Sequence, residues 1–195
     1  ISASSEGRKS NREWINECAK ALDIAFTVGG GITSAVDVRE VLASGADKVA
    51  INTAALNNPQ LISEGARAFG SQCIVIAVDA KKVNGEWKVF SYGGTRTTGK
   101  NALDWAVECE SLGAGEILLT SIDADGTKAG FNIELTKAVA DKVGIPVIAS
   151  GGAGCERDFL EVFLKTNCDA ALAAGIFHYG ETSIGKVKGF LAKNN

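Results

Sequence analysis

Aspartate residues at the ends of apolar strands are the side chains of this sequence best suited to proton transfer. Asp79 follows the run Ile74-Val75-Ile76-Ala77-Val78 directly and precedes two lysines. A carboxylate at the C-terminal end of a buried strand is well placed to act as a general acid or base. An aspartate that caps a helix, or that forms a salt bridge with Lys81 or Lys82, explains the position equally well. Asp79 is therefore a candidate for catalysis, with a structural alternative that remains open.

Two further aspartates follow a second apolar run. Asp123 and Asp125 come after Ile117–Ile122, and Gly126 and Thr127 follow them. One of the two carboxylates could orient a loop while the other contacts a substrate. The sequence Asp-Gly-Thr is also an ordinary turn, so turn formation alone is the competing interpretation.

Two glycine-containing stretches have the same layout and predict binding of phosphate. The first runs from Gly29-Gly30-Gly31 through a helical pattern and an apolar run to Asn52-Thr53. The second runs from Gly151-Gly152-Ala153-Gly154 through an equivalent pattern to Ala174-Gly175. Glycine allows the backbone to approach an anion closely, and N–H groups at a following helix start favour negative charge. Two copies of this layout in one chain predict a ligand with two phosphates.

Other kinds of site have little support in the sequence. His178 is the only histidine, and a lone histidine is more often a structural or surface group than a catalyst. The five cysteines form no CxxC pair, so we predict reduced thiols and no metal site. The glycine stretches match neither GxGxxG nor a Walker loop, and we predict no cofactor.

Composition limits the class of protein. With 195 residues, 46% of them apolar, the chain can bury one core, and we expect a single domain over residues 1–195. A net charge of −3 without a basic cluster argues against nucleic acid as a partner. No apolar run reaches membrane-spanning length and no signal peptide is visible, so we expect a cytoplasmic protein.

The chain alternates short apolar runs with helical patterns, which predicts βαβ units and a parallel sheet. All runs are continuous rather than alternating, as in strands buried on both faces. Ser34, Asn58 before Pro59, and Asn101 are expected helix caps. The expected strands are Ala25–Val28, Lys48–Ile51, Cys73–Val78, Glu116–Thr120, Val147–Ser150 and Ala170–Ala173. The expected helices are Asn11–Leu22, Ser34–Ser44, Pro59–Phe69, Ala102–Leu112, Ile133–Val143 and Arg157–Lys165.

One insertion and one repeat complete the predicted fold. Asn84-Gly85 lies between alternating residues and predicts a hairpin within residues 80–99, either an active-site lid or a decoration. The stretch Ile1–Gly7 resembles Ser121–Gly126, which suggests two similar halves. The second half has an additional portion in front whose counterpart would precede Ile1. We therefore expect a TIM (β/α)8-type barrel of the α/β class that lacks its first β/α unit and most of its second.

Several longer motifs resemble one family. The stretches Phe26–Ile32, Gly45–Ala54 and Val78–Lys81 look like the β/α barrels of histidine biosynthesis. Gly115–Gly130, Ala149–Gly154 and Ala170–Gly175 narrow the resemblance to the cyclase subunits of imidazole glycerol phosphate synthase. The resemblance extends over the whole chain, from Ile1 to about Asn195. The sister isomerase of the pathway shares the repeat but fits Leu118–Thr127 less well.

The resemblance implies a lyase-type cyclisation that uses ammonia from a glutaminase partner. Its substrate would be a ribulosyl aminoimidazole carboxamide ribonucleotide with two phosphates. Asp79 matches one of the two catalytic aspartates of the family, and the other would precede Ile1. Lys48 and Glu116 match two members of a charged ammonia gate at the base of the barrel. The implied phosphate ligands are Gly31, Asn52 and Thr53 on one side and Asp125, Gly126, Gly152, Ala174 and Gly175 on the other.

Two consequences follow from the expected missing unit. With one of two carboxylates, activity of the chain alone would be impaired, since each such group contributes about 10²–10⁴-fold. An open barrel also has two sheet edges, and a homo-oligomer would cover them. The alternatives are a non-catalytic, phosphate-binding oligomeric barrel fragment and the related phosphoribosyl-formimino isomerase.

Overall fold

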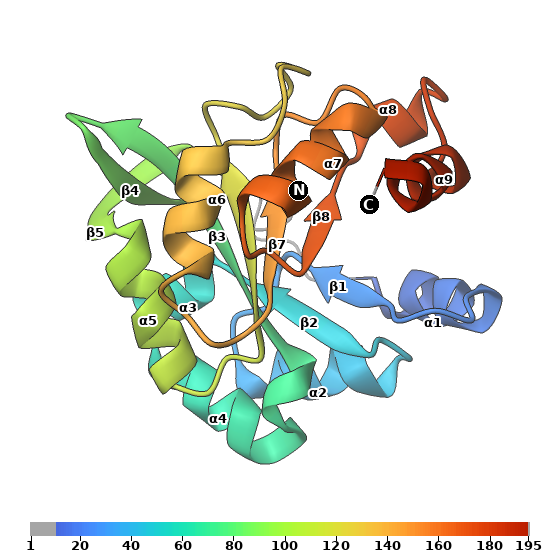
Figure 1. The fold of residues 1–195 in the computed structure, drawn as a ribbon. Coiled ribbons are helices and arrows are strands. Elements are labelled where there is room, and N and C mark those ends of the chain that lie inside the picture. Colours follow the sequence, from blue (N-terminus) through green and yellow to red (C-terminus); the bar gives the residue numbers. More distant parts are fainter. Residues whose placement is uncertain (1–10, 195) are drawn as a thin grey trace.

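The computed structural model describes residues 11–194, and a parallel sheet lies at its centre (Figure 1). Its strands are connected in the order β1-β2-β3-β6-β7-β8, and each neighbouring pair is parallel. These strands are β1 (Thr27–Gly29), β2 (Lys48–Ile51), β3 (Ile74–Val83), β6 (Glu116–Ser121), β7 (Val147–Ser150) and β8 (Ala170–Leu172). The spatial order follows the chain order without reversal.

Helices connect the strands and cover one side of the sheet. Because parallel crossovers are right-handed and the strand order never reverses, successive helices are placed on the same face. Accordingly, α5 contacts α6, α6 contacts α7, and α7 contacts α9. The helices are α1 (Arg12–Ala21), α2 (Ala35–Ala43), α3 (Thr53–Asn57), α4 (Gln60–Phe69), α5 (Ala102–Ser111), α6 (Ile133–Ala140), α7 (Glu156–Lys165), α8 (Gly175–His178) and α9 (Ile184–Asn194), with a 3-10 turn η1 (Ser71–Cys73). This is an α/β fold of the β/α-barrel type, as predicted.

The alternation of burial along the strands differs from the prediction. Val49, Ile51, Ile117 and Leu119 are almost completely buried under the helices, whereas the residues between them are only half buried. The expectation of strands buried on both faces was therefore wrong for β2 and β6, and it is confirmed for the start of β3, where Ile74, Val75 and Ile76 are all buried. Within the part of the chain that the structure describes, the face opposite the helices is only partly covered. This half-buried face carries the polar residues of the candidate site.

The predicted hairpin is present and larger than expected. β3 continues past Asp79 to Val83, and β4 (Glu86–Ser91) returns antiparallel to it. Asn84 and Gly85 both have positive φ, 51° and 83°, which suits a two-residue hairpin turn. β5 (Arg96–Asn101) then pairs with β4 and leads directly into α5. The sequence indicated neither the extension of β3 nor β5.

Most element boundaries agree with the sequence to within a few residues. Ser34 and Asn101 cap α2 and α5 through their side chains, as predicted. Asn58 does not cap α4, because Pro59 itself has helical φ and ψ and occupies the capping position. The short helices α3 and α8 and the C-terminal helix α9 were not predicted.

Two sequence-based expectations concern the limits of the barrel. The stretch Ile1–Gly7, on which the proposed repeat rests, lies largely within residues 1–10, outside the described residues. Within residues 11–194, β1 pairs only with β2, and β8 pairs only with β7.

Among the described helices, none is both long and apolar enough to span a bilayer.

Candidate active site

Asp79 lies on β3 at the level where the parallel strands end, and the structure removes the structural alternative for it. Because β3 continues to Val83, Asp79 caps no helix. In the described part of the chain, Lys81 forms its ion pair with Asp123 and Lys82 forms its ion pair with Glu134. Neither lysine is paired with Asp79, so this carboxylate is held by other contacts.

Burial raises the pKa of the Asp79 carboxyl from 3.8 to about 6. The nearby negative charge of Asp125 contributes to this increase as a smaller cause than burial, and a hydrogen bond with the Thr120 side chain opposes both effects. Thr120 is the direct neighbour of Asp79 in the register between β3 and β6. A pKa near 6 suits a group that exchanges protons near neutral pH.

Asn52, at the end of β2, contacts Asp79 directly. Its Nδ2 donates a hydrogen bond of 3.0 Å to Asp79 Oδ2. Both side chains stand on the half-buried face, because β2 and β3 are adjacent and parallel. The sequence placed Asn52 among phosphate ligands and did not predict this contact with the carboxylate.

Thr53 connects the site to the hairpin. The backbone N–H of Tyr92, in the turn between β4 and β5, donates to Thr53 Oγ1 at 3.0 Å. Tyr92 has a positive φ of 52°, and the Arg96 guanidinium lies over its ring at 4.5 Å. The turn between β4 and β5 therefore contacts the first residue of α3. No sequence signal pointed to Tyr92, because the contact spans 39 positions.

The loop after β6 contains the second pair of aspartates, which have different surroundings. Asp123 Oδ2 accepts the Lys82 backbone N–H at 2.9 Å and so fixes the loop to the extended β3. Asp125 is exposed and close enough to Asp79 to influence its pKa. Of the two, Asp123 is the one that orients a loop. Contact of Asp125 or Gly126 with a ligand stays a prediction.

The glycines after β7 are packed against this same loop. Gly130 N–H donates to the Gly152 carbonyl at 2.8 Å. A side chain at Gly152, which has a φ of 103°, would collide with the Gly130 carbonyl oxygen. Gly152 is therefore required for close backbone contact, whether or not it also binds an anion. Ala174 and Gly175 are exposed after β8, and a Cβ at Gly175 would meet nothing within 4 Å.

Lys48 and Glu116 form an ion pair at the opposite end of the strands. They begin β2 and β6, and the bond between Lys48 Nζ and Glu116 Oε1 passes across β3. Both side chains are mostly buried, at 26% and 17% exposure. The structure thus brings together two residues that the family resemblance assigned to one gate, although their function as a gate is not tested by this contact.

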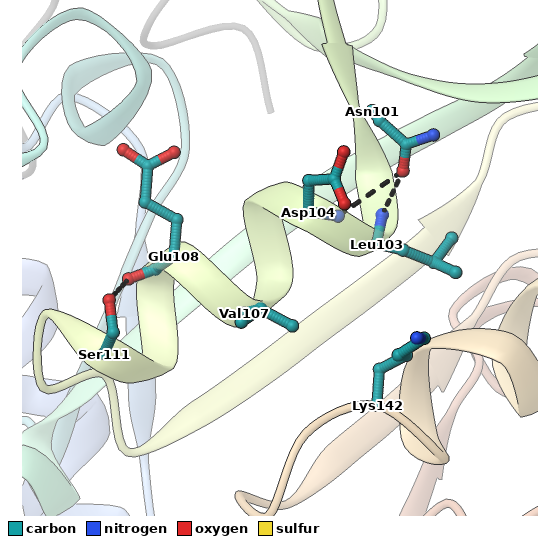
Figure 2. Close-up of a pocket in the computed structure, with 7 residues that line it drawn as sticks. All are labelled: Asn101, Leu103, Asp104, Val107, Glu108, Ser111 and Lys142. Atoms are coloured by element: carbon teal, nitrogen blue, oxygen red, sulfur yellow. Dashed lines mark hydrogen bonds between the residues drawn. The ribbon is translucent and has the colours of Figure 1, made fainter.

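The remaining candidates lie outside this cluster. His178 is exposed on α8 beside Tyr179, consistent with a surface role. A surface hollow of about 740 Å³ is lined by α5 and Lys142 (Figure 2). Three of its polar groups have structural roles: Asn101 caps α5, the Glu108 carboxylate is paired with Lys100, and the Ser111 hydroxyl donates to the Glu108 carbonyl.

Fold and site together define a class of protein. A parallel sheet in chain order, helices on one side, a carboxylate of raised pKa at the strand ends and two glycine turns on either side of it describe a β/α-barrel enzyme scaffold. Comparison with known proteins agrees with this description. The family model "Histidine biosynthesis protein" matches residues 1–183.

Individual relatives identify the branch of the family. The imidazole glycerol phosphate synthase subunit HisF of Geobacillus kaustophilus (strain HTA426) is 57% identical over 193 residues, which cover 98% of this chain and 77% of the relative. The HisF subunit of Geobacillus thermodenitrificans (strain NG80-2) is 55% identical over the same shares. That of Halalkalibacterium halodurans is 54% identical, over 96% of this chain and 75% of the relative. The chain belongs to the HisF family, the cyclase subunits of histidine biosynthesis.

Proposed function

We propose that Asp79 is the general acid–base group of a HisF-type cyclase reaction in this chain. The reaction is the ammonia-dependent cyclisation and cleavage of a bis-phosphorylated ribulosyl aminoimidazole carboxamide ribonucleotide, a lyase-type step. The observation that carries the proposal is the Asp79 carboxyl, half buried at the strand ends, with a pKa raised to about 6. Such a group can accept and return a proton near neutral pH.

The two glycine turns would hold the two phosphates of this substrate. One phosphate would be bound by Gly31 and Thr53, with Asn52 beside them, and the other by Asp125, Gly126, Gly152, Ala174 and Gly175. The spacing of these groups along the strand ends supports the assignment, because Asp79 lies on β3, between β2 and β6 in the sheet. An elongated substrate fixed at both phosphates would extend across Asp79.

The test is ammonia-dependent turnover of the bis-phosphate ribonucleotide. Asp79→Asn keeps the shape of the side chain and removes proton transfer, so we expect kcat to fall on the order of 10²- to 10⁴-fold. The matched control is Asp104→Asn, an exposed carboxylate on α5, which should leave kcat unchanged. Equal activity of Asp79→Asn and the unmodified chain would contradict the catalytic role. Phosphate binding without any turnover would favour the non-catalytic alternative.

Ammonia would reach the site from the opposite end of the strands. The Lys48–Glu116 ion pair lies there, and its partial burial supports a role in a gate. We expect a glutaminase subunit to dock at this end. Glu116→Gln should then lower glutamine-dependent turnover in the presence of the glutaminase more than turnover with added ammonium. The same loss with both ammonia sources would argue for a purely structural ion pair.

We also propose that copies of this chain associate through the sheet edges, in the cytoplasm where amino-acid biosynthesis takes place. In the described residues β1 and β8 each have a single strand partner. Leu172 on β8 and Trp14 on α1, the helix that precedes β1, are exposed apolar side chains, at 41% and 58%. Light scattering at micromolar concentration tests this proposal, and a monomeric mass would contradict it.

A further inference from the structure

Asn52 is the residue whose contacts differ most from its expected role. Its Nδ2 donates to Asp79 Oδ2 at 3.0 Å, a contact between the ends of adjacent strands. The orientation of the amide follows from chemistry as well as from distance. An ionised carboxylate only accepts hydrogen bonds, so an Asn52 oxygen in this place would oppose another oxygen. The amide oxygen is therefore directed away from Asp79.

That amide oxygen, Asn52 Oδ1, is buried and without a hydrogen-bond partner. Among the side chains of residues 11–194 it is the one buried nitrogen or oxygen atom in this state. Buried polar atoms are nearly always hydrogen-bonded, and exceptions occur where strain or function compensates the cost. The unpaired oxygen belongs to the same amide group as the Nδ2 donor that contacts the candidate catalytic carboxylate. Its position therefore points to function.

The neighbouring Thr53 has the complementary chemistry. Its Oγ1 accepts the Tyr92 N–H, and within residues 11–194 its own hydroxyl proton has no acceptor. A phosphate dianion presents only acceptor oxygens, so it can bind the Thr53 hydroxyl but not the free Asn52 oxygen. The two adjacent residues are thus suited to different parts of a ligand.

We propose that Asn52 is a positioning residue for Asp79 and that its amide oxygen accepts a hydrogen bond from an O–H or N–H group of the substrate, while phosphate is left to Thr53 and the glycine turn. The proposal rests on the proposed function of Asp79. It places a hydroxyl or amine of the sugar-derived chain, next to the phosphate, at the amide oxygen of Asn52, on the side of this amide that faces away from Asp79.

The first test follows Asp79 itself, independently of turnover. Asn52→Leu removes the Nδ2 donor in a side chain of similar volume, and the lost hydrogen bond favoured the ionised carboxylate. We expect the pKa of Asp79, read by carbon-13 NMR titration, to rise by about 1 above its value near 6. Asn58→Leu, an exposed asparagine after α3, is the matched control and should not change it. An unchanged pKa in Asn52→Leu would overturn the positioning role.

The second test uses calorimetry with inorganic phosphate and with ribose 5-phosphate as probes. Asn52→Leu should bind inorganic phosphate as well as the unmodified chain does, within twofold, and bind ribose 5-phosphate about tenfold more weakly. Equal weakening for both probes would assign Asn52 to phosphate and overturn the proposal. So would a ribose 5-phosphate affinity that the substitution leaves intact. If Asn52→Leu does not fold by circular dichroism, Asn52→Ala, which needs no extra space, replaces it in both tests.

These readouts separate the inference from the proposed function. Loss of turnover on Asp79→Asn tests the catalytic role of the carboxylate, whereas the pKa and binding measurements test what Asn52 does to it. An inactive chain with the expected Asn52→Leu results would contradict only the proposed function. A fully active chain without them would contradict only the inference.

Discussion

The two ends of the candidate site share a backbone plan and differ in their side chains. The first turn pair consists of residues 30–31 after β1 and 52–53 after β2, and the second of residues 151–154 after β7 and 173–175 after β8. In both turn pairs, the aspartate directly before the second strand accepts a hydrogen bond from a backbone N–H at or next to the start of the first strand. Asp47 Oδ2 accepts the Phe26 N–H at 2.8 Å, and Asp169 Oδ2 accepts the Val147 N–H at 3.0 Å.

The difference lies in what each turn pair contacts. The first ends in Asn52 and Thr53, whose side chains contact Asp79 and the hairpin. The second ends in Ala174 and Gly175, which have no polar side chain, and its glycines are packed against the loop at Gly130. One backbone plan therefore serves two purposes. The first pair contacts the candidate catalytic carboxylate, and the glycines of the second pair are packed closely against the backbone of a neighbouring loop.

The largest expected effect tests the rigidity of the second turn pair. Gly152→Ala places a methyl group against the Gly130 carbonyl at a φ of 103°, so we expect a loss of about 3 kcal/mol or more in the free energy of unfolding. Urea denaturation measures it. Gly126→Ala, also at positive φ but with nothing within 4 Å, is the control and should cost about 1 kcal/mol. Similar losses in both variants would show that packing against Gly130 is unimportant.

The next effect tests whether the ionised carboxylate of Asp79, next to the first turn pair, lowers the stability of the fold. The pKa of Asp79 is about 6 in the folded chain against 3.8 for the free group, so the folded state binds more protons between these values. Stability contributed by the protonated form is therefore lost as pH rises from about 4 to 6. At pH 7 Asp79→Asn should be more stable than the unmodified chain by roughly 2 kcal/mol, and near pH 3.5 about equally stable.

The control for this prediction is Asp104→Asn, which should show no such difference between the two pH values.

The substitution Asp125→Asn tests the electrostatic link between the two turn pairs. Removing its negative charge should lower the pKa of Asp79, because that charge helps to raise it. The acidic limb of the pH–rate profile would move to lower pH. A profile that does not move would mean that the two ends of the site are electrostatically independent.

A smaller effect tests the contact between the first turn pair and the hairpin. Thr53→Val removes the acceptor for the Tyr92 N–H, and we expect a loss of about 1 kcal/mol in unfolding free energy. Hydrogen exchange of the Tyr92 amide should become faster. In Thr97→Val, an exposed position on β5, the Tyr92 amide should keep its protection. Unchanged exchange in Thr53→Val would mean that other contacts hold the turn between β4 and β5.

The smallest effect tests whether the second turn pair binds an anion through its backbone. Gly175→Ser adds a hydroxyl where a Cβ meets nothing within 4 Å, so the fold should accept it. If phosphate binds there, the added donor should tighten binding about threefold in calorimetry. Gly189→Ser on α9, equally open, is the control. Tighter binding in neither variant would argue against a phosphate at Gly175.

The sequence by itself determined the alternation of strands and helices. β2 and β7 lie where they were predicted, because local signals specify them: short β-branched runs, capping side chains and glycines after helices. It also determined that two similar glycine turns stand at strand ends and that Asp79 directly follows the apolar part of β3, since strand period and turn chemistry are local properties. The family resemblance rested on the same motifs.

Only the tertiary structure decided what these residues contact. The bonds Asn52–Asp79, Tyr92–Thr53 and Lys48–Glu116 join residues 27, 39 and 68 positions apart. Such separations depend on strand order, register and the crossing of β3, which no local pattern specifies. For the same reason the raised pKa of Asp79 could not be predicted, because burial and the charge of Asp125 exist only once the sheet has formed. The sequence therefore gives the residues and their elements, and the fold decides which of them meet.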